Sequence, residues 1–452
     1  MKYVLNLGEE TNLEDEGTIL KILEYHDRLV KEYKKLQRYA DGEHDILYRP
    51  DKGPGKPNNK VASPYPSYIV DVATGYFAGK PVTYTASESD SGQELLLEYQ
   101  SILDKNDEQD QNFNLAKNSL TKKHCFEIVY AVKHGEGDSA QVELELGIEE
   151  PENMIMIYNN GLKEEPIGAV RRYTKSTLDH EQTEVIEVYT REKIIYFDFV
   201  NSGLTYTDEE DHIFSDMVPV VEYKANDRRF GVFEKVLTLI DAYDISQSDT
   251  VNDIEYFADA YLYLIGMLGT ESEDVEEMKE NRVLLLDKEG SAGFLEKGSN
   301  NETQEALKKR LEEDIHRLSM VPNLQDEHFS GVSTGIALKF KLWGLEQVGA
   351  TLERKFKKGI RRRIELITTA LNKMGGNYDP TDISMTFTRN IPADTKTEAE
   401  VVQILRGIVS SKTLLSWLSK IDDPGEEYDR VQDELEGVED LEPEVPEDTT
   451  ED

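Results

Sequence analysis

A long amphipathic stretch between Phe233 and Leu268 constrains the fold more than any other part of the sequence. Mostly apolar side chains recur there at spacings of three and four residues, with Gln247 as the polar exception on the same line. They are Val236, Ile240, Tyr243, Val251, Ile254, Ala258, Tyr261, Ile265 and Leu268. This spacing predicts one face of a helix, which at about 1.5 Å per residue would be roughly 50 Å long. Such a helix is too long for one small domain to cover, so we expect its other faces to contact water or another subunit.

Acidic residues exclude this stretch as a membrane span, because Asp241, Asp244, Asp249 and Asp253 interrupt every apolar run. The chain has 452 residues, enough for two or three hydrophobic cores, and 31% of them are charged. Its single cysteine, Cys125, cannot form an internal disulfide, and the first residues lack the pattern of a signal sequence. We therefore expect a protein that is made and used in the cytoplasm.

The formal net charge of −40 is distributed unevenly. Residues 422–452 contain sixteen Asp or Glu and one Arg, which supplies −15 and leaves −25 for the other 421 residues. With Pro424, Pro443 and Pro446, this acidic tail is expected to be disordered or loosely helical. Tight sequence-specific binding to duplex DNA is disfavoured in such a chain, because affinity for DNA comes largely from phosphate neutralisation.

Hydrophobic periodicity predicts an α+β chain that combines long helices with a predominantly antiparallel sheet. Helices are expected at 18–39, from 67 to a stop at Gly79, as a pair within 91–122, at 301–320, at 335–373 and at 395–420. Short β-branched and aromatic runs over 124–223 predict about six to eight strands. Further extended segments are expected after Pro81, within 282–297 and at 383–390, whereas 1–16 is expected to be mobile and 41–63 to be a loop.

Neither a catalytic, a metal nor a cofactor site is predicted by the motifs in the sequence. GYFAGKP, residues 75–81, lacks the glycine spacing of a phosphate-binding loop and has Pro81 where that loop needs a hydroxyl. Asp249 and Asp253 lie one helical turn apart and could share a metal, but without a flanking His a polar helix surface accounts for them better. The neighbours His124 and Cys125 do not predict a dyad, because adjacent strand residues point to opposite faces.

A basic cluster, RKFKKGIRRR at residues 354–363, contrasts with the acidic remainder of the chain. Its cationic members are Arg354, Lys355, Lys357, Lys358, Arg361, Arg362 and Arg363. They could contact phosphates, pair with acidic surfaces of neighbouring subunits, or belong to a solvated helix surface. The acidic net charge favours pairing between subunits.

Three segments, in this order along the chain, resemble the portal proteins of long-tailed double-stranded DNA bacteriophages. They are PNNKVASPYPSYIVDVATGYFAGKPVTYT (57–85), VPVVEYKANDRRFGVFEKVLTLIDAYDISQSDTVNDIEYFADAYLYLIG (218–266) and EEDIHRLSMVPNLQDEHFSGVSTGIALKFKLWGLE (312–346). The resemblance extends over about residues 18–420 and is weaker at ASPYPSY, with prolines at 64 and 66, and in the acidic tail. It implies a ring, usually a dodecamer, at one vertex of the capsid, with an axial channel for DNA.

The resemblance also implies the wing, stem, clip and crown regions of that family. Residues 1–17 would be a flexible N-terminus, 18–233 the wing, 234–266 the first stem helix, 267–299 the clip, 300–320 the second stem helix, 321–334 the tunnel loop, 335–394 the long wing helix and a strand, 395–421 the crown helices and 422–452 an acidic disordered tail. Six tunnel-loop residues would face the channel and its DNA: Gln325, Asp326, Glu327, His328, Phe329 and Ser330. Between Leu324 and Thr334 there is no Lys or Arg, which agrees with a wall that lets DNA slide.

As a portal, the chain would have as partners copies of itself, a terminase packaging motor, a head–tail adaptor, and scaffold and major capsid proteins. Double-stranded DNA would pass through without sequence recognition, no cofactor would be needed and no reaction would be catalysed. The protein would be assembled in the host cytoplasm and reside at the portal vertex of the virion. Two alternatives stay open: a metal-dependent nucleic-acid enzyme that uses the Asp-rich helix, and a capsid scaffold or decorating protein without a channel.

Overall fold

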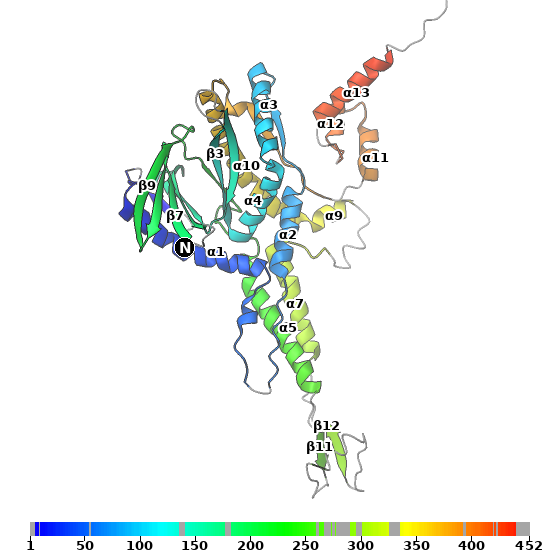
Figure 1. Cartoon of the computed structure of the whole chain (residues 1–452). Helices are drawn as coiled ribbons and strands as arrows, with labels where there is room; N and C mark the ends of the chain where they lie inside the picture. Colours follow the sequence, from blue (N-terminus) through cyan, green and yellow to red (C-terminus); the bar gives the residue numbers. More distant parts are fainter. Residues whose placement is uncertain are drawn as a thin grey trace, which may run out of the picture. The chain divides into compact units, whose positions relative to one another are not determined.

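The computed structural model describes residues 5–8, 10–53, 56–134, 141–176, 182–258, 262–265, 273, 276, 290–294, 301–324, 335–391, 395–418, 420–421 and 424–439. The chain forms two compact units, each built from segments that are distant in sequence. Unit 1 contains Met1–Lys34, Val70–Gly231 and Val321–Asp452, and unit 2 contains Lys35–Ile69 and Val232–Met320. Their mixture of helices and mainly antiparallel strands confirms the predicted α+β class (Figure 1).

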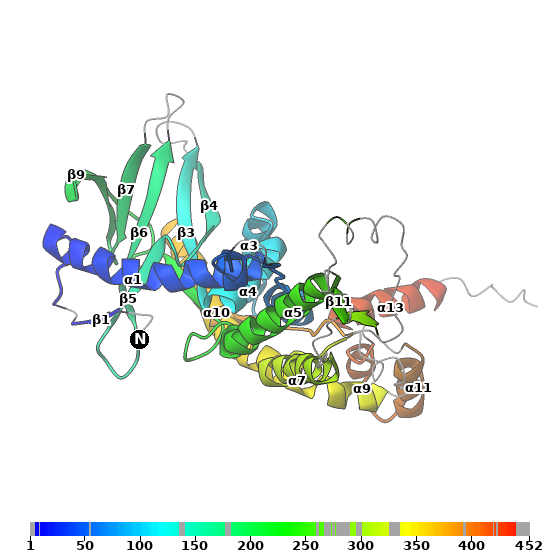
Figure 2. The same cartoon turned by 90° about the horizontal axis from the view of Figure 1, so that it is seen from below.

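Unit 1 contains a six-stranded sheet in the order β1-β5-β6-β7-β8-β9. The strands are β1 (Leu5–Leu7), β5 (Met154–Asn159), β6 (Pro166–Ser176), β7 (Gln182–Tyr189), β8 (Lys193–Val200) and β9 (Gly203–Asp211). All pairs are antiparallel except β1, which runs parallel to β5 (Figure 2). Every residue of β5 is buried, because both faces of this strand contact a hydrophobic core.

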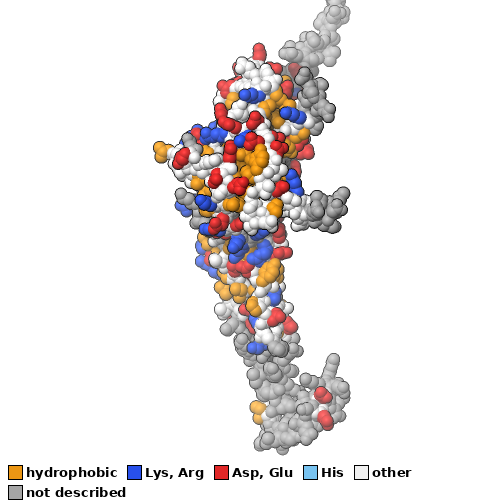
Figure 3. All heavy atoms as spheres, turned by 60° about the vertical axis from the view of Figure 1, so that its left-hand side comes forward, with side chains coloured by type: hydrophobic (Ala, Val, Ile, Leu, Met, Phe, Trp, Pro, Cys, Tyr) orange, Lys and Arg blue, Asp and Glu red, His pale blue; other side chains and the backbone are white. Residues whose placement is uncertain are grey.

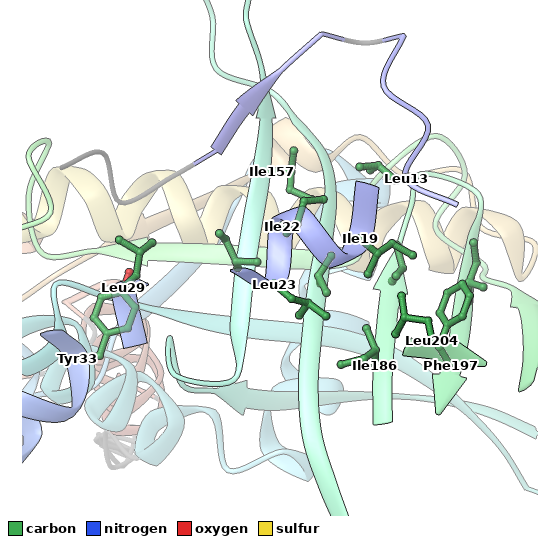
Figure 4. Close-up of a cluster of buried hydrophobic side chains, with 14 residues drawn as sticks. Leu13, Ile19, Ile22, Leu23, Leu29, Tyr33, Ile157, Ile186, Phe197 and Leu204 are labelled. Carbon is green, nitrogen blue, oxygen red and sulfur yellow. The ribbon is translucent and has the colours of Figure 1, made fainter. Parts of the chain in front are cut away.

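Helix α1 spans Glu16–Ala40, and its residues up to Lys34 belong to unit 1. This part of the helix covers one face of the six-stranded sheet. Asp15 caps the helix by accepting a hydrogen bond of 2.8 Å from the backbone N–H of Thr18. Apolar residues of α1 then pack on the alternate residues of the strands that face the helix (Figure 4). The core contains Ile19, Ile22, Leu23, Leu29, Tyr33, Ile155, Ile157, Val170, Ile186, Val188, Ile195, Phe197 and Leu204.

The predicted flexibility of residues 1–17 is wrong for part of that segment. Leu5–Leu7 pair with Ile157–Asn159 as β1, and Leu13 is buried in the core beneath α1. Sequence periodicity could not detect this segment, because three leucines, Leu5, Leu7 and Leu13, are too few to form a periodic pattern. The segment is nevertheless held in place, because these side chains pack against the core and lose apolar contact with water.

A second sheet of unit 1 has the order β10-β3-β4, with β3 (His124–His134), β4 (Gln141–Glu149) and β10 (Val220–Lys224). The expectation of one sheet over 124–223 is therefore wrong, and the strands divide between two antiparallel arrays. The other face of β5 connects them, because Met154, Met156 and Tyr158 share a core with Phe126 of β3 and Val220 of β10. Alternation along β5 thus places two different cores on its two sides.

The remaining helices of unit 1 agree with the predicted ranges in position. They are α3 (Asp90–Lys105), α4 (Glu108–Lys122), α9 (Gly335–Lys341), α10 (Trp343–Lys373), α11 (Thr395–Leu405) and α12 (Ser411–Leu415). The helix expected at 335–373 is divided at Leu342, whose ψ of 0° departs from helical geometry. At its other end α10 stops in a Schellman turn, in which Gly375 has φ of +114° and the N–H of Gly376 donates to the carbonyl of Leu371 over 3.0 Å.

Unit 1 also contains a two-stranded sheet and a C-terminal helix. Strand β2 (Thr83–Ala86), after Pro81, pairs antiparallel with β13 (Ile383–Thr386), which confirms both predicted extended segments. Pro424–Glu439 forms helix α13, which agrees with the helical alternative for the acidic tail and contradicts disorder over these residues. Its only basic residue, Arg430, lies within 4 Å of Glu426 and Glu427, which stabilises the first turns. Residues 440–452 lie outside the described residues.

Unit 2 is a helical hairpin with a covering segment. A short 3-10 turn at Glu234–Val236 leads into α5 (Leu237–Ala258), and α7 (Asn301–Ser319) packs against it. The two run antiparallel, since Gln304 near the start of α7 contacts Asp253 near the end of α5 over 3.1 Å. The unit also contains a 3-10 turn at Asp45–Tyr48 and the first residues of α2 (Tyr65–Ala78), a helix that continues into unit 1.

The expected helix over 234–266, with its apolar line extending to Leu268, is too long. The structure ends α5 at Ala258 and forms β11 (Leu262–Ile265), which pairs antiparallel with β12 (Ser291–Phe294). A run of aromatic and branched side chains favours a strand, and Gly266 directly after it is a poor helix former. Strand β12 agrees with the predicted β element, whereas most of 267–299 lies outside the described residues. Among the helices that the structure describes, none is both long and apolar enough to span a bilayer.

The burial of His26 on α1 predicts a pH dependence of stability. Burial lowers the pKa of His26, and its Nε2 lies 2.7 Å from the carbonyl oxygen of Pro151, to which the neutral ring donates. Because the folded-state pKa lies below the unfolded value of about 6.5, the unfolded state binds more protons as the pH falls below that value. The free energy of unfolding should then decrease, by up to about 1.4 kcal/mol per pH unit for this group.

Urea unfolding at pH 7.5 and 5.5, followed by circular dichroism, measures this loss. His26→Gln retains an N–H for Pro151 but does not titrate, so the difference between the two pH values should be smaller in the variant by about 1 kcal/mol. An equal difference in variant and wild type would contradict the assignment.

Candidate functional site

The seven cationic residues of the basic cluster all lie on α10, but they do not form one surface. Ten consecutive helical residues span almost three turns, so their side chains point in several directions. Arg363 points into the core of unit 1, and Lys355, Lys358, Arg361 and Arg362 line a cavity. Arg354 and Lys357 are outside that lining. The three groups have different surroundings and therefore different roles.

Arg363 is fully buried and cannot contact a neighbouring subunit or a phosphate, which corrects its predicted role. Its guanidinium donates two hydrogen bonds of 2.8 and 2.7 Å to Glu127 on β3. Two further bonds, of 2.7 and 2.9 Å, reach Glu108 and Asn112 on α4. Burial alone would lower the pKa of Arg363, but Glu127, Tyr223 and Glu108 hold it well above its usual value. Arg363 is thus a charged part of the core.

The next group of basic residues lines a cavity of about 660 Å³. Residues of α10 form one wall, β10 forms another, and the connection between β5 and β6 contributes Lys163, Glu164 and Glu165. Gly359 of α10 makes the close approach to β10 possible, because a Cβ there would lie 2.6 Å from the ring of Tyr223. The volume is in the range of ligand pockets.

The lining of this cavity is strongly charged. The cationic members are Lys163, Arg191, Lys224, Lys355, Lys358, Arg361 and Arg362, and the acidic ones are Glu164, Glu165, Asp216, Glu222, Asp227 and Glu365. Glu222 is occupied by Arg229, which donates to both its oxygens over 2.7 and 2.9 Å. Burial and the nearby Lys224 and Lys355 lower the pKa of Lys358. Positive charges therefore crowd one another in this part of an acidic protein.

Arg354 and Lys357 belong to the exposed surface of α10. Lys357 pairs with Glu353 at 2.7 Å, four residues earlier on the same helix, and Arg389 donates to the same carboxylate over 2.7 Å. Arg354 is exposed and forms no ion pair with a residue that the structure describes. These two positions are compatible with the solvated helix surface that the sequence left open.

In unit 2, a line of polar side chains on α5 holds the segment that precedes α2. The backbone N–H groups of Asn59, Val61 and Ser63 donate to the side chains of Asn252, Ser248 and Asp244 over 2.6, 2.9 and 2.8 Å. The buried positions Val236, Ile240, Asp244, Ser248 and Asn252 follow one another at intervals of four. The face that the segment covers is thus partly polar, and Ile254 of the predicted apolar line is 65% exposed.

No local pattern in the sequence could identify the buried partners of this polar line, because they are 200 or more residues away. His44 Nδ1 lies 2.6 Å from Asp244 Oδ2, and both side chains are fully buried. Tyr39 stacks on His44 with ring centroids 4.7 Å apart and donates to Asp241 over 2.6 Å. A buried imidazole–carboxylate pair fixes where the segment around His44 lies on α5.

The acidic residues that could have held a metal have other partners. Asp249 accepts from Arg49 over 3.1 Å and from Lys52 over 3.0 Å, and these cations lower the pKa of Asp249 although burial opposes them. Asp253 accepts from Gln304. Within the described ranges no group of three or more His, Cys, Asp or Glu side chains is arranged to hold a metal ion. The polar-surface interpretation of this helix is the one that these contacts support.

The remaining motifs also have structural explanations. Burial raises the pKa of Cys125 to about 12, and its thiol lies 3.4 Å from the carbonyl oxygen of Glu149. The neighbouring His124 contacts Tyr33 and Glu222 instead. Gly79 follows the last residue of α2, where a Cβ would lie 2.2 Å from the carbonyl oxygen of Gly75. It therefore marks a helix end, as predicted, and not a phosphate loop.

The six predicted channel residues Gln325, Asp326, Glu327, His328, Phe329 and Ser330 lie outside the described residues. The described chain reaches Leu324 after the end of α7 at Ser319, and α9 begins at Gly335. The contacts that the resemblance assigns to these six residues stay predictions.

The family model and the curated relatives that match this chain are all phage portal proteins. The family described as "Phage portal protein, SPP1 Gp6-like" matches residues 19–440. The portal protein of Bacillus phage SPP1 is 25% identical over 399 residues, which cover 84% of this chain and 77% of that protein. The portal protein of Clostridium phage phiCD119 is 27% identical over 297 residues, which cover 61% of this chain and 63% of that protein.

Two solved structures of phage-like particles are also similar. "Neck of empty GTA particle computed with C6 symmetry" has a TM-score of 0.44 at 14% identity and covers 78% of this chain and 90% of its own. "Virion of native gene transfer agent (GTA) particle" has a TM-score of 0.40 at 13% identity and covers 78% and 89%.

The buried position of Arg363 predicts a large effect on stability. Arg363→Met would leave the carboxylates of Glu108 and Glu127 buried without their cation, which should lower the free energy of unfolding by about 3–5 kcal/mol. Arg361→Met on the same helix is the matched control, because Arg361 is exposed and the change should stay within about 0.5 kcal/mol. Urea unfolding measures both.

A second variant separates loss of charge from loss of packing. Adding Glu127→Gln and Glu108→Gln to Arg363→Met removes the orphaned charges and should recover part of the stability. Equal effects of Arg363→Met and Arg361→Met would contradict a core role for Arg363.

Proposed function

The chain belongs to the SPP1 Gp6-like family of phage portal proteins, and we propose that copies of it close into a ring, a dodecamer, around a channel for double-stranded DNA. The ring would lie at one vertex of the capsid, admit DNA during packaging and release it at infection. Its parts would follow the wing, stem, clip, tunnel-loop and crown ranges that the sequence suggested, with α5 and α7 as the stem helices.

The observation that carries the ring is the exposed apolar surface of the hairpin in unit 2. Ile245 and Ile254 on α5 are 48% and 65% exposed, and Leu307 and Leu318 on α7 are 50% and 51% exposed. Large apolar side chains repeated along two packed helices favour burial against another subunit. A second copy offers the same faces, and a rotation that repeats one contact closes into a ring.

The charge of the chain supports a conduit over a DNA-binding protein. A wall that neutralised phosphates would hold DNA, whereas a net charge of −40 repels it. On the face shown in Figure 3, acidic and basic side chains are interspersed with apolar ones, and basic residues are not gathered into a single stripe. The tunnel loop would lie nearest to the DNA, where Asp326, Glu327 and His328 supply no permanent positive charge.

We assign no reaction to the protein. The energy of packaging would come from a separate terminase motor, which together with a head–tail adaptor would contact the clip. Scaffold and major capsid proteins would surround the wing during assembly in the host cytoplasm. The engagement of Asp249 by Arg49 and Lys52 supports this assignment over metal-dependent cleavage of nucleic acid.

Electron microscopy of the purified protein tests the ring directly. We expect closed rings with a central hole, alone or after addition of the scaffold protein, and subunit number can be counted in top views. The double variant Ile254→Lys and Leu307→Lys should reduce ring formation, because it places charge at the proposed contact. A compact monomer at high concentration, with or without scaffold, would contradict the proposal.

The tunnel loop gives a prediction that concerns DNA passage alone. Replacing Asp326, Glu327 and His328 by Ala should leave ring formation intact and change packaging only modestly, because the loop would act by its size. Inserting several bulky residues between Asp326 and Glu327 should preserve rings but obstruct DNA entry. DNA protected from nuclease in filled capsids measures packaging, and micrographs control for assembly. Location of 324–330 on the outside of a ring would refute the assignment.

A further inference from the structure

The cavity beside α10 has more positive charge than its own chain neutralises. Among its cationic residues, Arg191, Lys358 and Arg361 form no ion pair within 4.0 Å with a residue that the structure describes. Among the carboxylates of the lining, Asp216 likewise forms no ion pair within 4.0 Å with a described residue. The lining therefore has three unpaired cations and one unpaired carboxylate, and its positive charge is in excess.

The other carboxylates of the lining are already occupied. Glu164 and Glu222 lie 3.6 and 3.3 Å from Lys224, and Glu165 lies 3.2 Å from Lys163. Glu365 lies 3.4 Å from Arg362, and Asp227 pairs with Lys355. Arg362 also has a buried Nε without a hydrogen-bond partner among the described residues. Burial and Arg191 lower the pKa of Arg362, although Glu365 acts in the opposite direction. The cavity thus has unused donors and uncompensated positive charge, which an anionic ligand would satisfy.

We propose that this cavity binds an acidic peptide, and that its occupant is the segment 440–452 of this chain, from the same or a neighbouring copy. That segment has seven Asp or Glu in thirteen residues and no Lys or Arg. Pro443 and Pro446 disfavour a helical backbone at the residues before them, which suits entry of an extended peptide. Because the segment is covalently attached to every copy, its local concentration is high without a separate partner.

An acidic peptide fits the cavity better than nucleic acid does. Glu164, Glu165 and Asp216 belong to the same lining as the cations, and a continuous phosphate backbone would have to pass close to them. A peptide can instead place single carboxylates beside Arg191, Lys358 and Arg361 and keep neutral residues such as Val445 near the acidic members. The overall charge of −40 further opposes a long polyanion.

Peptide binding in solution tests the site without depending on ring formation. The probe is a fluorescein-labelled peptide of residues 438–452, followed by fluorescence anisotropy at low ionic strength. The acceptor is the full chain with Glu442→Gln, Glu444→Gln, Glu447→Gln and Asp448→Asn, so that its own segment does not compete. We expect saturable binding that weakens as salt is added. A probe with the same four substitutions should not bind.

Two double variants on α10 remove the same charge from different places. In this acceptor, Lys358→Gln with Arg361→Gln should weaken binding about tenfold or more, because two cations that line the cavity are lost. Arg354→Gln with Lys357→Gln is the matched control outside the cavity and should change binding less than about twofold. Absence of saturable binding, or equal effects of the two double variants, would overturn the proposal. Displacement of the probe by a DNA oligonucleotide of equal charge at equal or lower concentration would also overturn it.

Crosslinking of the wild-type chain identifies the source of the segment. A carbodiimide joins Lys358 to a carboxylate in contact with it, and a mixture of isotope-labelled and unlabelled chains reports which copy supplied each partner. Crosslinks of one isotope only indicate the segment of the same copy, and mixed crosslinks indicate a neighbour. Failure to join any lysine of the cavity to residues 440–452 would overturn the proposal. Ring counts in parallel micrographs keep this result separate from the proposed portal function.

Discussion

Unit 1 depends on one buried charge, that of Arg363. Arg363 of α10 donates to Glu127 on β3 and to Glu108 and Asn112 on α4, while Tyr223 of β10 and Tyr84 of β2 donate to the same carboxylates. Five elements, from β2 near residue 84 to α10 at residue 363, therefore share a single network. Taking these charges from water costs several kcal/mol, which the hydrogen bonds offset only if every partner is in place. The network thus selects one relative placement of helix and sheet, and it removes Arg363 from any surface that a neighbour or DNA could contact.

In unit 2, side chains of helix α5 accept the backbone hydrogen bonds that a neighbouring β-strand would otherwise accept. Asp244, Ser248 and Asn252 are four residues apart, a rise of about 6.0 Å along a helix. The amides that they accept from, at Asn59, Val61 and Ser63, are two residues apart, about 6.6 Å in an extended chain. The two periods nearly coincide, so three successive backbone donors find acceptors without a sheet. This explains why a segment containing PNNK, which cannot sustain regular structure, still has a defined position on α5.

Local periodicity was enough to predict most helices and the α+β class, but not which face of a helix is buried. The stripe from Val236 to Leu268 contains good apolar spacing, yet Asp244, Ser248 and Asn252 are buried and Ile254 is exposed. The polar side chains are buried because His44 and residues 59–63 cover them. The partner of β11 lies beyond Gly266 and Gly269, so a pattern within one helix-length window cannot detect it. For the same reason RKFKKGIRRR favoured subunit pairing but left phosphate contact and a solvated helix surface open, whereas the structure divides it into a core residue, a cavity wall and an exposed edge. Glu108 and Glu127 are more than 200 residues away from Arg363, and nothing in the cluster itself distinguishes that arginine from Arg361.

The distribution of cations completes the connection between fold and function. An acidic portal still needs positive charge to stabilise its own carboxylates, and the described structure places much of it in pairs within the chain, such as Arg363 with Glu127, Arg229 with Glu222, and Arg49 with Asp249. A cation that is already paired gains little from a phosphate, since contact with DNA would require breaking the existing bond. Internal pairing therefore reduces the affinity of the protein for DNA in two ways. It lowers the number of cations that are free to contact phosphates, and it leaves the net charge of the chain negative. Weak attraction along the whole path is what a channel needs if DNA is to move through it in both directions.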